Sequence, residues 1–160
     1  MATLAHAQSL LDPTLTPGAI NPNVTQNNIH QTICVSGWVK TISPPTNYTN
    51  QLKLTQLKEY GYTDLNPDHY EEDHLISLEL GGSPKDPKNL WPEPLAGEWG
   101  AHAKDKVENK LKKMVCAEKI TLKEAQNAIT VNWIDAYKKY ALIKTNHNDH
   151  RLKYHILEGK

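Results

Sequence analysis

The chain has 160 residues, 38% of them hydrophobic and 22% charged, and its 18 basic side chains balance its 18 acidic ones. This is the length of one ordinary domain, and the composition is typical of a globular protein; it excludes a coiled coil, a collagen and an apolar run long enough to span a membrane. The charge is uneven, because residues 1–80 hold three basic and eight acidic side chains, whereas residues 81–160 hold fifteen and ten. Such a division suits a metal-binding edge beside a phosphate-binding face, although it can also even out on folding.

Residues 1–31 are rich in proline, asparagine, threonine and glutamine and show little periodicity. This composition predicts an extended arm that lies over a domain. Ala5-His6-Ala7 has the A-x-A form of a signal-peptidase site, but the apolar stretch that should precede such a site is missing. Residues 1–7 are therefore either the remnant of a secretory signal or small residues in an unstructured terminus.

Residues 32–41 mix β-branched side chains with Trp38 and predict a short strand that holds Cys34. The other cysteine, Cys116, is too distant for the C-x-x-C spacing of a zinc site. The two could form one long-range disulfide, which would contribute roughly 4 to 5 kcal/mol in the chain-entropy model. Pairing depends on the compartment. A secreted or periplasmic location is our expectation, and a cytoplasmic protein with two free thiols is the alternative.

The middle of the chain predicts a helix followed by a hairpin. Residues 49–60 have helical periodicity, and Gly61 is placed as the C-terminal cap. Residues 75–80 predict a short strand or its shoulder, and Gly81-Gly82 forces a sharp reversal. Residues 89–92 can then form the return strand.

Two helices are predicted in the second half. The first runs from about Gly100 to Val115 and buries apolar residues at four-residue spacing. Thr121 and Glu124 form a capping box that opens the second. The residues expected to be buried are Val107, Leu111 and Val115 on the first, and Ile129, Trp133, Ala136, Tyr137 and Tyr140 on or after the second. Residues 144–160 form a polar, histidine-rich tail.

The residues that carry chemistry are Asp73-His74, the Gly-Gly turn, Asn89 and a helix with His102, in the order strand, turn, strand, helix. The stretch from Tyr70 to Glu108, above all DHLISLELGG and KNLWPEP, resembles the core of HNH (ββα-metal, His-Me finger) endonucleases. More loosely, residues 12–140 resemble small bacterial and phage-associated proteins with this core, which often begin with a secretory signal. The resemblance implies an α+β fold: one HNH nuclease domain over residues 32–143, with a ββα core at about 70–114, an N-terminal arm and additional C-terminal helices.

The chemistry makes physical sense independently of the family. Hydrolysis of a phosphodiester needs neutralised charge, a deprotonated water and help for the leaving oxygen. A divalent ion supplies the first and the last, and an imidazole with a pKa near neutrality can take the proton of the water. By resemblance, Asp73 is a metal ligand and His74 is the general base. Asn89 braces the loop and helps to orient the base.

The third position of the motif is open. His102 is our choice as the further metal ligand, because it falls in the first turn of the helix, although the family spacing after the asparagine is somewhat shorter. The alternatives are Asp105, Glu108 and Asn109 on the helix and Glu71 and Glu72 on the strand side. Lys104, Lys106 and Lys110 are the predicted contacts to nucleic-acid phosphates, and a solvated helix face is the other interpretation.

The predicted reaction is hydrolysis of DNA, with RNA as a second substrate, dependent on one divalent ion. Magnesium is the first choice; manganese, nickel and zinc also suit carboxylate and imidazole ligands. Low sequence specificity is expected, because no helix-turn-helix, zinc finger or basic arm is evident. The alternatives are an inactive HNH-like module that binds nucleic acid and a secreted interaction protein. A metallopeptidase is poorly supported, since the chain has no H-E-x-x-H.

Overall fold

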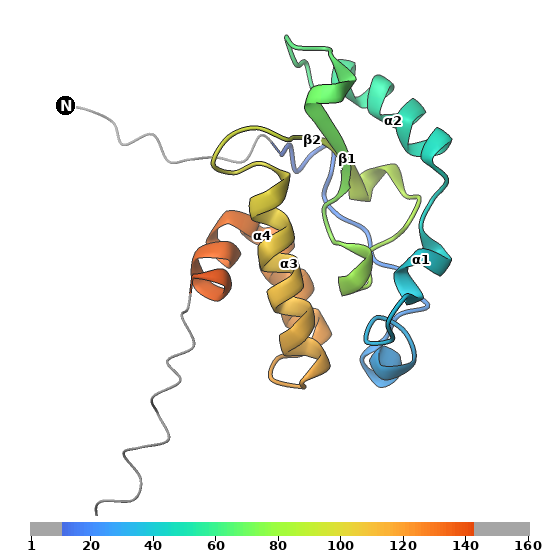
Figure 1. The fold of residues 1–160 in the computed structure, drawn as a ribbon, viewed down its shortest axis with the longest axis vertical. Helices are drawn as coiled ribbons and strands as arrows, with labels where there is room; N and C mark the ends of the chain where they lie inside the picture. Colours follow the sequence, from blue (N-terminus) through green and yellow to red (C-terminus); the bar gives the residue numbers. More distant parts are fainter. Residues whose placement is uncertain (1–10, 143–160) are drawn as a thin grey trace, which may run out of the picture.

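The computed structural model describes residues 11–142, an α+β arrangement around a small antiparallel sheet (Figure 1). Strands β1 (Tyr70–His74) and β2 (Leu90–Pro94) pair so that His74 lies opposite Leu90 and Asp73 opposite Trp91. The α-helices are α1 (Trp38–Ile42), α2 (Thr46–Glu59), α3 (Ala101–Cys116) and α4 (Leu122–Ala136), and a π-helical turn (Tyr137–Ala141) follows α4. Short 3-10 turns occur at Gln26–Gln31, Pro67–His69, Leu78–Leu80 and Pro87–Asn89.

Some expectations lie outside the described residues, namely the signal remnant at residues 1–7 and the polar tail from residue 144. Within residues 11–142, no helix combines the length and the apolar character needed to cross a membrane.

In Figure 1 the sheet lies between α2 and the pair formed by α3 and α4. On the first side, the Gln56 amide of α2 donates to the carbonyl oxygen of Leu90 at 2.9 Å. On the other side, α3 packs against α4 and the π-helical turn, and its predicted apolar stripe is buried. The core combines this stripe with residues from the arm, the β1–β2 connection and α4: Val24, Ile29, Ile33, Leu75, Ile76, Leu80, Val107, Leu111, Val115, Leu122, Ala125, Ile129, Trp133, Ile134 and Ala136.

Helix ends follow the chemistry predicted for them. Thr121 caps α4 by accepting a hydrogen bond from the backbone N–H of Glu124, whose carboxylate bonds the N–H of Thr121 in return. Gly61 follows α2 in the left-handed region, with φ +67°, and Tyr62 donates back to the carbonyl of Leu57. Both ends satisfy backbone groups that a helix leaves unpaired.

The strand predicted at residues 32–41 is wrong, and residues 75–80 form the shoulder of a strand rather than a strand. Residues 32–41 form turns and the start of α1 rather than a strand, because they have no neighbouring strand to pair with and Gly37 takes φ +81°. Residues 75–80 lie after β1, which ends at His74, and close with a 3-10 turn. A short apolar run carries no periodicity that separates a strand from a buried loop.

The N-terminal segment is only partly extended, since Gln26–Gln31 is a 3-10 helix. Before that helix, the segment lies along the β1–β2 connection. The backbone N–H of Asn21 donates to the carbonyl oxygen of Gly81, and the backbone N–H of Ser83 donates to that of Ala19, both at 2.8 Å. After it, Cys34 forms a disulfide with Cys116 at the end of α3. The disulfide therefore ties the N-terminal segment to the C-terminal end of α3.

Candidate active site

Asn89 holds the β1–β2 connection in shape. Its side chain is completely buried, and its Oδ1 accepts from the backbone N–H of Ile76 at 3.0 Å. Its Nδ2 donates to the carbonyl oxygens of Ile76 and Ser83, both at 3.0 Å. The amide therefore satisfies buried backbone groups that no strand pairing satisfies. This is the bracing geometry expected of Asn89; any part that it plays in catalysis stays a prediction.

The Gly-Gly turn makes this bracing possible. Gly81 takes φ +76°, in the region that glycine favours, and Gly82 donates to the carbonyl of Ser77 at 3.0 Å. A Cβ at Gly82 would collide with the carbonyl oxygen of Ile76 and would stand 2.9 Å from the Asn89 amide nitrogen. Gly82 is therefore the residue that lets the connection close tightly around Asn89.

His74 is held by the same connection. Its Nε2 lies 2.9 Å from the carbonyl oxygen of Pro84. A carbonyl can only accept, so Nε2 carries the proton and the lone pair of the neutral ring is on Nδ1. Burial lowers the pKa of His74 below its ordinary value, while the Pro84 carbonyl and Asp73 oppose that change. The ring is therefore oriented, neutral at pH 7 and able to accept a proton at Nδ1.

A hollow of about 340 Å³ lies beside this histidine. Ionisable groups from β1, from the connection and from α3 line it: Asp73, His74, Glu79, Asp105, Glu108 and Lys112. Lys112 is partly exposed, and its Nζ lies 3.5 Å from Glu79 Oε2. The hollow thus contains one base candidate, one accessible ammonium group and an excess of carboxyl groups.

Lys104 occupies the position next to Asp73. Its side chain has no exposed surface, and its Nζ donates to Asp73 Oδ2 and to the carbonyl oxygen of His74, each at 2.7 Å. The third bond goes to Glu108 Oε1, one helical turn further along α3. Burial alone would lower the pKa of the Lys104 ammonium, but the surrounding carboxyl groups outweigh burial and raise it. The expectation that Lys104 contacts nucleic acid is therefore corrected, since its ammonium is buried and all three donors are used.

Glu93 completes the cluster around Lys104. It is completely buried, and no donor from another group among residues 11–142 reaches either carboxyl oxygen. Burial raises the pKa of Glu93 to about 11, and the negative charge of Asp73 adds to the effect. Glu93 is therefore protonated at neutral pH, and its hydroxyl can donate to Asp73. Burial also raises the pKa of Glu108, to about 8.

The predicted ligand pair Asp73 and His102 does not fit a metal ion here. His102 is exposed and lies near Glu71 and Asp105. It is two residues from Lys104, about 200° around the helix, so it faces away from the side that contacts Asp73. Of the alternatives, Asp105 and Glu108 line the hollow and Asn109 is exposed. Across residues 11–142, no three His, Cys, Asp or Glu side chains are grouped closely enough to hold a metal ion.

Electrostatics supports the same conclusion. A divalent ion on Asp73 would be close to the Lys104 ammonium, and at a separation of about 6 Å their repulsion costs roughly 5 kcal/mol at an effective dielectric of 20.

The sequence contains a signal for the burial of Lys104 that its charge alone does not reveal. Lys104 lies on the stripe of α3 that includes Ala101, Val107 and Leu111, all of them buried. The other two predicted phosphate contacts differ from it, since Lys106 is exposed and Lys110 is half-buried.

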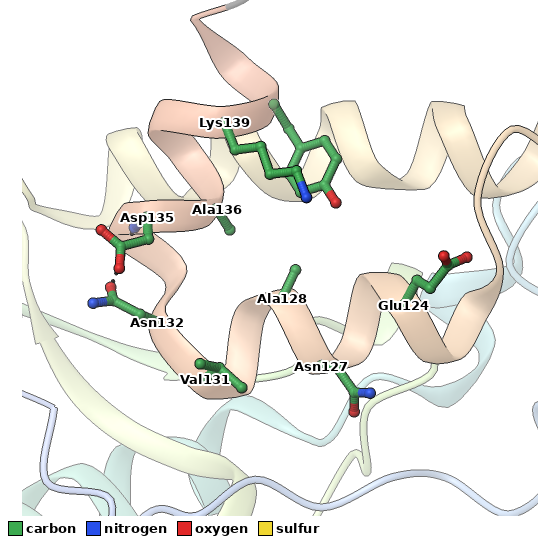
Figure 2. Close-up of a pocket in the computed structure, with 9 residues that line it drawn as sticks. Glu124, Asn127, Ala128, Val131, Asn132, Asp135, Ala136 and Lys139 are labelled. Carbon is green, nitrogen blue, oxygen red and sulfur yellow. Dashed lines mark hydrogen bonds between the residues drawn. The ribbon is translucent and has the colours of Figure 1, made fainter.

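A second hollow, of about 430 Å³, lies on α4 and is separate from the site at His74 (Figure 2). The helix is interrupted at Asn132, whose φ is −167°, and the Asn132 Oδ1 accepts from the backbone N–H groups of Ile134 and Asp135. Asn132 thereby caps the last segment of α4. Figure 2 shows Lys139 reaching over this hollow from the turn that follows. The hollow has no histidine or cysteine in its lining.

Comparisons of the chain with models of protein families, with curated proteins and with solved structures give no match.

Proposed function

We propose that this chain is an HNH-type endonuclease that hydrolyses nucleic-acid phosphodiester bonds, DNA first and RNA second, at the hollow beside His74. The observation that carries the proposal is the orientation of His74: the Pro84 carbonyl accepts from Nε2–H, so Nδ1 is the basic nitrogen of a histidine that lines an open hollow. The order of β1, the Asn89-braced connection, β2 and α3 agrees with the ββα arrangement that the resemblance implies.

In the proposed reaction, His74 accepts the proton of the attacking water. A neutral imidazole with a depressed pKa is in the basic form at physiological pH, as a general base requires. Asn89 acts indirectly, because it fixes the connection that carries Pro84.

Neutralisation of the phosphate charge falls to accessible lysines. Lys112 lines the hollow together with His74, and Lys106 is an exposed lysine of the same helix. The divalent ion implied by the resemblance does not fit Asp73 and His102, so no step is derived through it, and the experiment varies it instead.

The test is plasmid nicking by the purified protein in EDTA and in magnesium, manganese, nickel or zinc, beside His74→Ala. His69→Ala is the matched control, since His69 is an exposed histidine paired with Asp64. Nicking by the wild type and by His69→Ala, but not by His74→Ala, supports the proposal. A folded wild type that fails to nick under every condition overturns it.

One observation favours a second candidate, a secreted interaction protein without nuclease turnover. Four carboxyl groups line the hollow against one accessible lysine, and this excess repels a phosphate. A folded wild type that neither retains nor cleaves DNA would support this interaction protein.

A further inference from the structure

The contacts of Lys104 are those of a bound cation. An ammonium has three N–H donors, and here they reach one aspartate oxygen, one glutamate oxygen and one backbone carbonyl oxygen. Carboxylate and carbonyl oxygens are also the ligands that hard metal ions take in proteins.

The carboxyl groups around Lys104 outnumber the ammonium. Asp73 and Glu108 bond it directly, and Glu93 stands beside Asp73 with both oxygens buried and without a donor from another group. An ion pair that only linked Lys104 of α3 to β1 would need a single carboxylate, Asp73. Three carboxyl groups, of which Glu93 and Glu108 are buried and Asp73 is partly buried, suit a site whose occupant is a cation.

We propose that the Lys104 ammonium is the resident cation of this site and fills the place beside Asp73 that the HNH resemblance assigns to a divalent metal ion. The wild type therefore binds no divalent ion through Asp73. Removal of the amine uncovers a cation site made by Asp73, Glu93, Glu108 and the His74 carbonyl, in which the flexible glutamate side chains close around the ion.

The inference about binding depends on geometry alone, but its catalytic consequence rests on the proposed function: hydrolysis at His74 proceeds without a metal ion on Asp73. Lys104 is a positioning residue in that reaction, because it bonds the backbone of His74 and does not reach the hollow as an exposed group.

The experiment titrates Mn²⁺ alone and measures the free ion by electron paramagnetic resonance, with wild type, Asp73→Asn, Lys104→Ala and the double variant Lys104→Ala/Asp73→Asn. Lys113→Ala, which removes an exposed lysine of the same helix, is the matched control. We expect the wild type, Asp73→Asn and Lys113→Ala to bind Mn²⁺ equally weakly. Lys104→Ala should bind one ion roughly 100-fold more tightly, because its carboxyl charges are no longer neutralised. The double variant should lose that site.

Binding of Mn²⁺ to the wild type that Asp73→Asn abolishes would overturn the proposal, and so would a folded Lys104→Ala without the new site. If Lys104→Ala fails to fold without Mn²⁺, the proposal is still tested by comparing Mn²⁺ binding of the wild type with that of Asp73→Asn. Nuclear magnetic resonance of the lysine ammonium groups is the second test. The Lys104 ammonium signal should be observable in the wild type and unchanged by Mg²⁺, and a shift or loss on addition of Mg²⁺ would contradict the proposal. These measurements need no nuclease activity, so a failure of the proposed function is distinguished from a failure of this inference.

Discussion

The side chain of Asn89 bonds both backbone groups of Ile76, accepting from its N–H and donating to its carbonyl, each at 3.0 Å. A single buried amide thus replaces a strand partner for a residue thirteen positions earlier in the chain. This relationship fixes the connection between β1 and β2, and through it the carbonyl that orients His74.

Asn89→Asp should lower the free energy of unfolding by about 3 kcal/mol, because a carboxylate cannot donate to Ile76 and Ser83 and its charge would be buried. Urea denaturation measures the change. Asn109→Asp, on the exposed face of α3, is the control and should change stability little. Equal stabilities of the two variants would show that the amide is not the brace.

His74→Ala should reduce nicking by roughly 100- to 10,000-fold, the usual contribution of a general base. In the wild type the rate should rise with pH as His74 loses its proton, level off before neutrality, and stay flat to pH 8, because burial lowers the pKa of His74 below 6.5. The pH dependence of kcat/KM measures this. A rate that continues to rise from pH 7 to pH 8 would assign the base to another group.

Glu72→Gln should stabilise the protein at pH 8 and have little effect at pH 4. Both Glu72 carboxyl oxygens are buried without a donor, and burial, followed by repulsion from Asp73, raises the pKa of Glu72 to about 8. A raised carboxyl pKa means that the folded state binds the proton more tightly than the unfolded state does. The contribution of Glu72 to the free energy of unfolding is therefore fully present below about pH 4.5. It decreases between about pH 4.5 and pH 8 and does not change further above pH 8.

The expected gain at pH 8 is about 1 to 2 kcal/mol, after allowance for the partial exposure of Glu72. Denaturation at several pH values measures it, with the exposed Glu59→Gln as control. A gain of the same size at pH 4 and at pH 8 would exclude titration of Glu72 as the cause.

Replacement of both Cys34 and Cys116 by serine should lower the free energy of unfolding by about 4 kcal/mol, because the disulfide closes a long loop of the unfolded chain. Thermal unfolding of this variant beside the wild type measures the loss. Thiol titration of denatured, unreduced wild type should find no free cysteine. Two free thiols would contradict the disulfide and remove the support that it gives to the expected secretion.

Local patterns predicted the helices well. Apolar spacing and the capping box placed α3 and α4 within a few residues, since these signals act between neighbours in sequence. The sequence also predicted the Gly81-Gly82 turn and a return strand at residues 89–92, which overlaps β2. The strand predicted at residues 32–41 was wrong, and β1 ends at His74, so that residues 75–80 form only its shoulder; a strand depends on a partner that the segment itself does not contain.

The sequence by itself determined the α+β class, the main helices and the order of strand, glycine turn, return strand and helix, because patterns close in sequence indicate these features. It left the pairing of Cys34 with Cys116 open and placed Lys104 on a phosphate-binding surface. The place of Lys104 on the apolar stripe of α3 indicated its burial, but only the tertiary structure decided that Asp73 and Glu108 are its partners and that Glu93 lies beside Asp73. The physical reason is that burial and charge pairing depend on which elements pack together: α3 delivers an ammonium to β1 across thirty-one residues of chain, a contact that no local pattern encodes.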